Sequence, residues 1–95
     1  MLIRSQDKTC ITNMEQATDV FCVEYRKGGK YNIIAALADG NTTNLGKYNT
    51  EEKAIKVLDM IEQAYCKSFE EQKQNYFGHR YDLIFHMPKD EEVEE

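Results

Sequence analysis

The stretch NLGKYNTEEKAIKVLDMIEQAYCKSF, residues 44–69, joins a short strand-like segment to a helix and decides the fold class. At 100° per residue, one side of the predicted helix is apolar and the opposite side is charged or polar. The apolar side carries Ala54, Val57, Leu58, Ile61, Tyr65 and Phe69. The pattern predicts a surface helix of about 20 residues, roughly 30 Å long, with one side packed on a sheet.

The beginning of this helix can satisfy its own free backbone groups. Asn49 or Thr50 can cap it, because either side-chain oxygen can accept a hydrogen bond from an N–H of the first turn. With Asn49 as the cap, Glu52 would occupy the third helical position, as in a capping box. Glu51 and Glu52 also lie near the positive end of the helix dipole and would repel an anion. We interpret this helix start as scaffold and not as a phosphate site.

The first half of the chain has the pattern of strands joined by glycine turns. The alternating, β-branched or aromatic segments are residues 1–4, 9–13, 19–26, 31–38 and 42–48. KGGK at residues 27–30 and the pair Asp39–Gly40 are typical of hairpin turns, because glycine supplies the positive φ that these turns need. The last three segments therefore predict an antiparallel meander within a sheet of about five strands.

Residues 81–88, YDLIFHMP, form the last predicted strand, which follows a segment, residues 70–80, where we expect the helix to fray. One side of this strand carries Tyr81, Leu83, Phe85 and Met87. The strand has no hairpin partner next to it in sequence, so it must pair with a distant strand or with another chain. Such an apolar face, if exposed, marks a partner surface, and these four residues are the predicted partner-binding site. Core packing is the expected role of Phe21, Tyr25 and Phe85.

The charge of the chain is concentrated at its C-terminal end. Of the formal net charge of −5, residues 89–95, KDEEVEE, contribute −4 through one Lys and five acidic residues. Residues 1–88 hold 11 Lys or Arg against 12 Asp or Glu and are nearly neutral. We predict one α+β domain over residues 1–88 and a disordered acidic tail over residues 89–95. Because a nearly neutral domain disfavours a large basic surface, no nucleic-acid partner is expected.

The length of 95 residues suits one domain and excludes an enzyme with separate cofactor and substrate domains. No run approaches the roughly 20 apolar residues that span a bilayer, and the N-terminus lacks the apolar core of an export signal. We therefore expect a cytoplasmic protein with no membrane partner. A chain this short buries a modest fraction of its surface, which makes homodimer formation a natural way to bury more.

Residues with metal-binding or nucleophilic chemistry are few and widely spaced. They are Cys10, Cys22, Cys66, His79 and His86, and none of the pairs has the short spacing of a zinc site. In a reducing compartment the cysteines are expected to be free. Cys66 with a histidine would have the groups of a nucleophile and its base, but the spacing does not bring them together. KGGK lacks the pattern of a phosphate-binding loop. No cofactor and no metal are expected.

The segments MLIRSQDK and LGKYNTEEKAIKVLDMI together resemble a set of short proteins of unknown function from Gram-positive bacteria and their prophages. The matching residues are Tyr48, Thr50, Glu52, Ala54, Phe85, Met87 and Pro88. The resemblance extends over most of the chain up to Pro88. It implies a common fold and a mobile-element origin, but it carries over no functional residue, because no activity belongs to the group.

The predicted fold is α+β, with an antiparallel sheet of about five strands, one long helix packed on it and a C-terminal strand, in an order that resembles pleckstrin-homology-like (PH-like) domains. Three functional hypotheses remain. The leading one is a non-enzymatic protein-interaction module that forms a homodimer by strand addition. The second is a phage or mobile-element effector that binds and inhibits a host protein. The third is a small enzyme or metal protein that uses Cys66 and a histidine.

Overall fold

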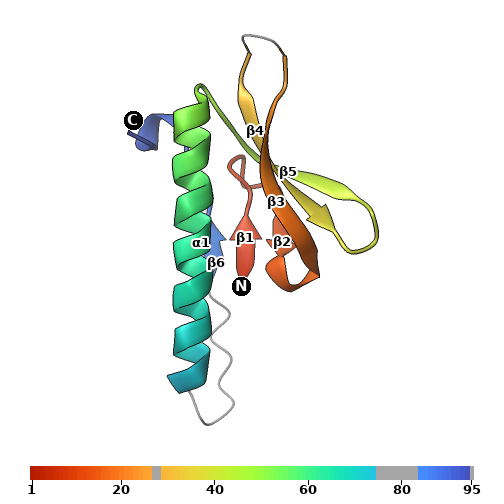
Figure 1. Ribbon diagram of the computed structural model, residues 1–95, viewed down its shortest axis with the longest axis vertical. Coiled ribbons are helices and arrows are strands. Elements are labelled where there is room, and N and C mark those ends of the chain that lie inside the picture. Colours follow the sequence, from red (N-terminus) through yellow and green to blue (C-terminus); the bar gives the residue numbers. More distant parts are fainter. Residues whose placement is uncertain (27–28, 75–83, 95) are drawn as a thin grey trace.

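The computed structural model describes residues 1–26, 29–74 and 84–94, and for residues 68–74 it describes the backbone. Its elements are β1 (Leu2–Arg4), β2 (Ile11–Asn13), η1 (Met14–Gln16), β3 (Ala17–Glu24), β4 (Tyr31–Leu37), β5 (Thr42–Tyr48), α1 (Glu51–Gln74), β6 (Ile84–His86) and η2 (Asp90–Glu92). One helix packs beside two small sheets, as Figure 1 shows. The predicted α+β class is confirmed.

The described strands form two sheets of three strands, in the orders β2-β1-β6 and β3-β4-β5. The prediction of one sheet of about five strands is therefore wrong. β1 pairs antiparallel with β2 and parallel with β6, and the turn η1 separates β2 from β3. With only three residues each, β1 and β2 are too short to extend the meander, and the chain turns at η1 into a second sheet.

The antiparallel meander of β3, β4 and β5 is confirmed. Its second turn uses Gly40, whose φ of 90° lies in the region that favours glycine. The Asp39 carboxylate supports the same turn, because it accepts a hydrogen bond from the Asn41 N–H at 2.9 Å. In the first turn, residues 27 and 28 lie outside the described residues.

A bulge between β4 and β5 changes which side chains of β5 face inward. Ile33 lies opposite Gly46 and Ile34 lies opposite Asn44, so Leu45 is the extra residue. A bulge re-aims side chains that simple alternation would place on the other side. Leu45 is 1% exposed and belongs to the core as a result.

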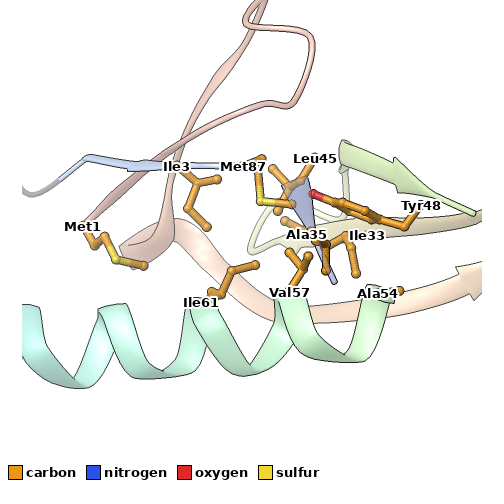
Figure 2. Close-up of a cluster of buried hydrophobic side chains, with 11 residues drawn as sticks. Met1, Ile3, Ile33, Ala35, Leu45, Tyr48, Ala54, Val57, Ile61 and Met87 are labelled. Carbon is orange, nitrogen blue, oxygen red and sulfur yellow. The ribbon is translucent and has the colours of Figure 1, made fainter. Parts of the chain in front are cut away.

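The core lies where the two sheets meet one side of α1 (Figure 2). Its buried apolar residues are Met1, Ile3, Ile33, Ala35, Leu45, Tyr48, Ala54, Val57, Ile61, Met87 and Val93. Figure 2 shows Ala54, Val57 and Ile61 pointing from the helix toward the strands, as the helical stripe predicts. Each fully buried aliphatic side chain of this kind contributes about 1.5–3 kcal/mol to folding.

The helix begins where the sequence predicts and extends further. Thr50 is the cap, since its Oγ1 accepts a hydrogen bond from the Lys53 N–H at 3.2 Å. The helix continues to Gln74, past the point where fraying is expected. Tyr65, predicted on the apolar stripe, is 45% exposed, and the Phe69 side chain lies outside the described residues.

The last strand pairs within its own chain. β6 runs parallel to β1, with Phe85 opposite Ile3, and the Met87 N–H donates to the Arg4 carbonyl at 3.0 Å. Residues 81–83, at the start of the predicted strand, lie outside the described residues. The pairing of β6 with β1 removes the unpaired strand on which the sequence-based homodimer hypothesis depended.

Candidate functional site

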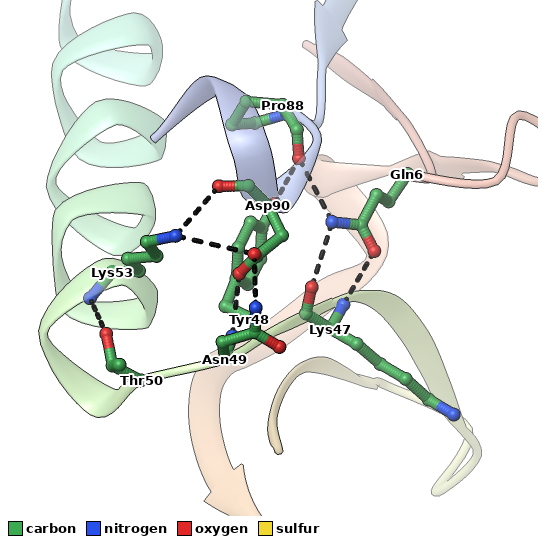
Figure 3. A network of polar contacts seen from close by, with 8 residues as sticks. All are labelled: Gln6, Lys47, Tyr48, Asn49, Thr50, Lys53, Pro88 and Asp90. Carbon is green, nitrogen blue, oxygen red and sulfur yellow. Dashed lines mark hydrogen bonds and ion pairs between the residues drawn. The ribbon is translucent and has the colours of Figure 1, made fainter. Parts of the chain in front are cut away.

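The segment after β6 docks against the start of α1 (Figure 3). The Asp90 carboxylate accepts hydrogen bonds from the Asn49 N–H at 2.7 Å and from Asn49 Nδ2 at 2.6 Å. Lys53 Nζ lies 3.4 Å from the same carboxylate. Val93 is 6% exposed and enters the core. Within residues 89–94 of the predicted tail, Asp90 and Glu92 thus have hydrogen-bond partners and one apolar residue is buried.

A buried hydroxyl connects the same segment to β5. The Tyr48 hydroxyl donates a hydrogen bond to the Pro88 carbonyl at 2.7 Å. Burial raises the pKa of Tyr48, and the charges of Asp90 and Glu92 raise it further. The phenol therefore stays protonated and remains a donor. Because the chain's own groups satisfy this network, we interpret it as a structural clamp and not as a site for a ligand.

Gln6 covers part of the outer edge of β5. Its backbone N–H donates to the Leu45 carbonyl at 2.8 Å. Its side-chain amide accepts from the Lys47 N–H at 2.8 Å and donates to the Lys47 carbonyl at 2.9 Å. The same Nε2 reaches the Pro88 carbonyl at 3.2 Å. One residue thus pairs with β5 as a neighbouring strand would (Figure 3).

The face of the β3–β4–β5 sheet that points away from α1 is called here the outer face. Ile33 and Ala35 are 0% exposed on the side of β4 that faces the core. Successive side chains of a strand alternate in direction, so the strand register assigns the outward positions. They are Asp19, Phe21 and Val23 of β3, Asn32, Ile34 and Ala36 of β4, and Thr42, Asn44 and Lys47 of β5.

The middle of the outer face is apolar and partly open to solvent. Val23 is 38% exposed, and Phe21 and Ile34 are half-buried. Tyr25, one position beyond β3, is 63% exposed, so its expected place in the core is wrong. Isolated exposed apolar residues are ordinary on a protein surface, whereas a contiguous group on one sheet face is typical of an interaction surface.

One end of the outer face is a depression of about 200 Å³, called here the cationic pocket. It is lined by Tyr25, Arg26, Gly29, Lys30, Asn32 and Lys47. The Arg26 guanidinium carbon lies 5.5 Å and the Lys47 Nζ lies 5.8 Å from the centre of the Tyr25 ring. Within the described residues, the one ion pair joins Lys53 to Asp90, so the three cations of the pocket have no carboxylate at ion-pair distance.

Asn32 is the buried member of the residues that line the cationic pocket. It is 5% exposed, and its Oδ1 has no hydrogen-bond partner among the residues that the structure describes. A buried acceptor without a donor costs about 1–3 kcal/mol, and such groups are infrequent in folded proteins. That oxygen is also closed to solvent.

The four residues predicted to bind a partner do not form an open surface in the described part of the chain. Met87 is 5% exposed in the core, and Phe85 is half-buried against it. Tyr81 and Leu83 lie outside the described residues. The neighbouring position Ile84 is the exposed one, at 47%. In the described part of this strand, Phe85 and Met87 face inward, and Ile84 and His86 are exposed.

The residues considered for metal binding or catalysis are distributed over the molecule. Cys10 and Cys66 are exposed free thiols, and Cys22 is a half-buried one whose pKa is raised by burial and by the charge of Glu51. His86 lines a separate depression of about 330 Å³ that Cys66 does not line, and His79 lies outside the described residues. Among the described side chains, no group of three or more His, Cys, Asp or Glu is placed to hold a metal ion.

Comparisons with known proteins add no relative. The chain matches no protein-family model, no curated protein and no solved structure. In the described part of the chain, no helix has both the length and the apolar character needed to cross a membrane. The outer face is therefore interpreted from its own side chains.

The sequence predicts Lys30 in a turn and Arg26 and Lys47 in strands, and it assigns none of the three to a site. Arg26 and Lys30 flank the glycines of KGGK, and Lys47 is 17 residues beyond Lys30. The register of β4 and β5 brings Lys47 opposite Asn32 and so beside the other two. The signal that could have found the site is the Asn32 position itself, a polar residue within the otherwise apolar strand YNIIAAL.

Proposed function

We propose that this protein is a non-enzymatic interaction module that self-associates through the outer face of its β3–β4–β5 sheet. The observation that carries the proposal is the open, partly apolar group formed by Phe21, Val23 and Ile34, which ends in the cationic pocket. Two such sheets would pack face to face about 10 Å apart, as in a β-sandwich, and these side chains would be buried between them. The proposal replaces strand addition at β6, which has its partner in β1.

The remaining polar groups support a binding role over a catalytic one. Catalysis needs a nucleophile or base within hydrogen-bond reach of a second activating group. The side chains of Tyr48 and Asp90 hold the C-terminal segment in place. The order of strands and helix resembles PH-like domains, but the proposal depends on the sheet face and not on that analogy.

The mass of the particle in solution tests the proposal. We expect wild-type protein to show a concentration-dependent dimer by sedimentation equilibrium. Ile34→Thr and Val23→Thr keep a β-branched side chain and should preserve the strands. Because each change occurs twice in a symmetric dimer, a loss of about 1 kcal/mol per copy would raise the dimer Kd roughly 30-fold.

Ile11→Thr is the matched control, since Ile11 is 49% exposed on the other sheet. It should leave the dimer Kd unchanged. Ile34 lies on β4, the central strand, which has no free edge. A weaker dimer in Ile34→Thr would therefore indicate packing of the sheet faces and not strand pairing at the β3 edge. A wild-type chain that stays monomeric at millimolar concentration would refute the proposed function. Equal effects of Ile34→Thr and Ile11→Thr would show that another surface is used.

A further inference from the structure

We infer that the partner on the outer face is a second copy of this chain. The two-fold axis lies in the plane between the two sheets and runs perpendicular to the strands. The cationic pocket of each copy then faces the acidic end of the other copy. This inference depends on the proposed self-association and adds its orientation. It is carried by the unequal charge of the two ends of the outer face.

The outer face has opposite charges at its two ends. The cationic end carries Arg26, Lys30 and Lys47 around the pocket. At the other end, Asp19 is exposed opposite Ala36, and Asp39 is exposed in the turn after β4. The apolar row of Phe21 and Ile34 lies between them. One face of the sheet thus has a positive end, an apolar middle and a negative end.

Two orientations can stack the outer faces of two copies with two-fold symmetry. An axis parallel to the strands would place the cationic ends of both copies together, where like charges repel. An axis perpendicular to the strands places each cationic end over the acidic end of the other copy. It keeps the two apolar rows in contact, because the Phe21–Ile34 row lies midway along the strands. Charge complementarity therefore selects the perpendicular axis, an isologous interface that closes at two copies.

The strand register says which side chains face each other in this dimer. A perpendicular axis keeps each strand over the same strand of the other copy. With the Phe21–Ile34 row at the axis, Lys47 therefore lies over Thr42 and Val23 lies over Asp19 of the other copy. Arg26, three positions beyond Val23, is the cation that continues the strand facing Asp19.

Paired charge reversals test the orientation. One variant carries Arg26→Glu and Lys47→Glu, which makes the cationic end acidic. The other carries Asp19→Lys and Thr42→Lys, which makes the acidic end cationic and leaves the turn at Asp39 intact. Each variant alone should be monomeric at concentrations where wild type is dimeric, because its two ends then have the same sign. An equimolar mixture should recover dimer, seen by native mass spectrometry as the heterodimer alone.

Three results would overturn the inference. Either variant alone dimerising as wild type does would show that the charged ends do not meet. Failure of the mixture to form heterodimer, with each variant folded by circular dichroism, would exclude the perpendicular axis while leaving wild-type self-association intact. Dissociation of the wild-type dimer by a short single-stranded oligonucleotide at low salt would assign the cationic pocket to a nucleic acid. A wild-type chain that is monomeric throughout would instead remove the proposed function, so the two failures are distinguishable.

Discussion

Substitution of Asp90 by alanine is expected to destabilise the protein by about 2 kcal/mol, because Asp90 fastens the C-terminal segment to the start of α1. A hydrogen bond to a charged group contributes about 1.5–3 kcal/mol when it is shielded from water. The carboxylate has two such bonds, both to Asn49, but Asn49 is exposed and water can replace part of each. The ion pair to Lys53 is itself partly exposed, with side chains at 18% and 28%, and adds less than about 1 kcal/mol.

Thermal unfolding followed by far-ultraviolet circular dichroism measures this loss. For a domain of this size, 1 kcal/mol corresponds to about 4–8 °C in Tm, so Asp90→Ala should lower Tm by about 8–16 °C. Glu91→Ala is the matched control, because it removes the same charge from the same turn at an exposed position and should change stability by less than about 0.5 kcal/mol. Both are compared at one protein concentration, since dimerisation makes Tm concentration-dependent. Equal Tm values for the two variants would refute the clamp and return the segment to a solvated tail.

Two further predictions concern titratable groups. Hydrogen bonds from the Ser5 hydroxyl, the Thr9 hydroxyl and the Thr9 N–H lower the pKa of Asp7 to about 2; the stabilisation from this ionised carboxylate is present above its ordinary pKa of 3.8 and is lost as the pH falls toward 2. Carbon-13 NMR should place its midpoint near 2, Ser5→Ala should raise that midpoint, and an unchanged midpoint in the variant would contradict the role of the Ser5 hydroxyl. The Cys22 thiol, with its pKa raised by burial and by Glu51, should react with a neutral-pH thiol reagent more slowly than the exposed Cys10 and Cys66, and equal rates in the folded protein would mean that the contact between β3 and α1 is not closed.

The elements that the sequence predicted well are those whose signals are local. The cap at Thr50, the inward side of α1 at Ala54, Val57 and Ile61, and the turn at Gly40 each depend on residues within a few positions of one another. Helix caps, helical periodicity and glycine turns have their physical causes in the neighbouring backbone. These features follow from the sequence because nothing distant is needed to produce them.

The features that the sequence did not predict depend on contacts between distant segments. β6 pairs with β1 across 82 positions, from Leu2 to Ile84, and periodicity alone does not identify a partner at that distance. The bulge at Leu45 reverses an inward and an outward position, and the adjacent Gly46 is a local sign of it that strict alternation passes over. Asp90 carries the same carboxylate charge as the neighbouring glutamates, so composition alone predicts the whole run as a tail.

The candidate site followed the same division. Alternation in residues 19–26 places Phe21 and Tyr25 on one side of the chain, and both were expected in the core, whereas that side belongs to the outer face. Which side of a sheet is buried depends on where the helix packs, and α1 packs on the side that carries Ile33 and Ala35. The cationic pocket appears only once β5 lies beside β4 and brings Lys47 next to Asn32.

The pairing of Gln6 with β5 also bears on aggregation. An uncovered strand edge is a template on which another chain can add a strand, and a sheet with two open edges can grow without limit. The Gln6 backbone N–H occupies the Leu45 carbonyl, and the Gln6 side-chain amide occupies the Lys47 N–H and carbonyl. These are hydrogen-bonding groups that an incoming strand would need. Among the described strands of this sheet, that leaves β3 as the edge available for addition. The contact of a single glutamine with β5 therefore removes part of one of the two edges on which another chain could extend this sheet.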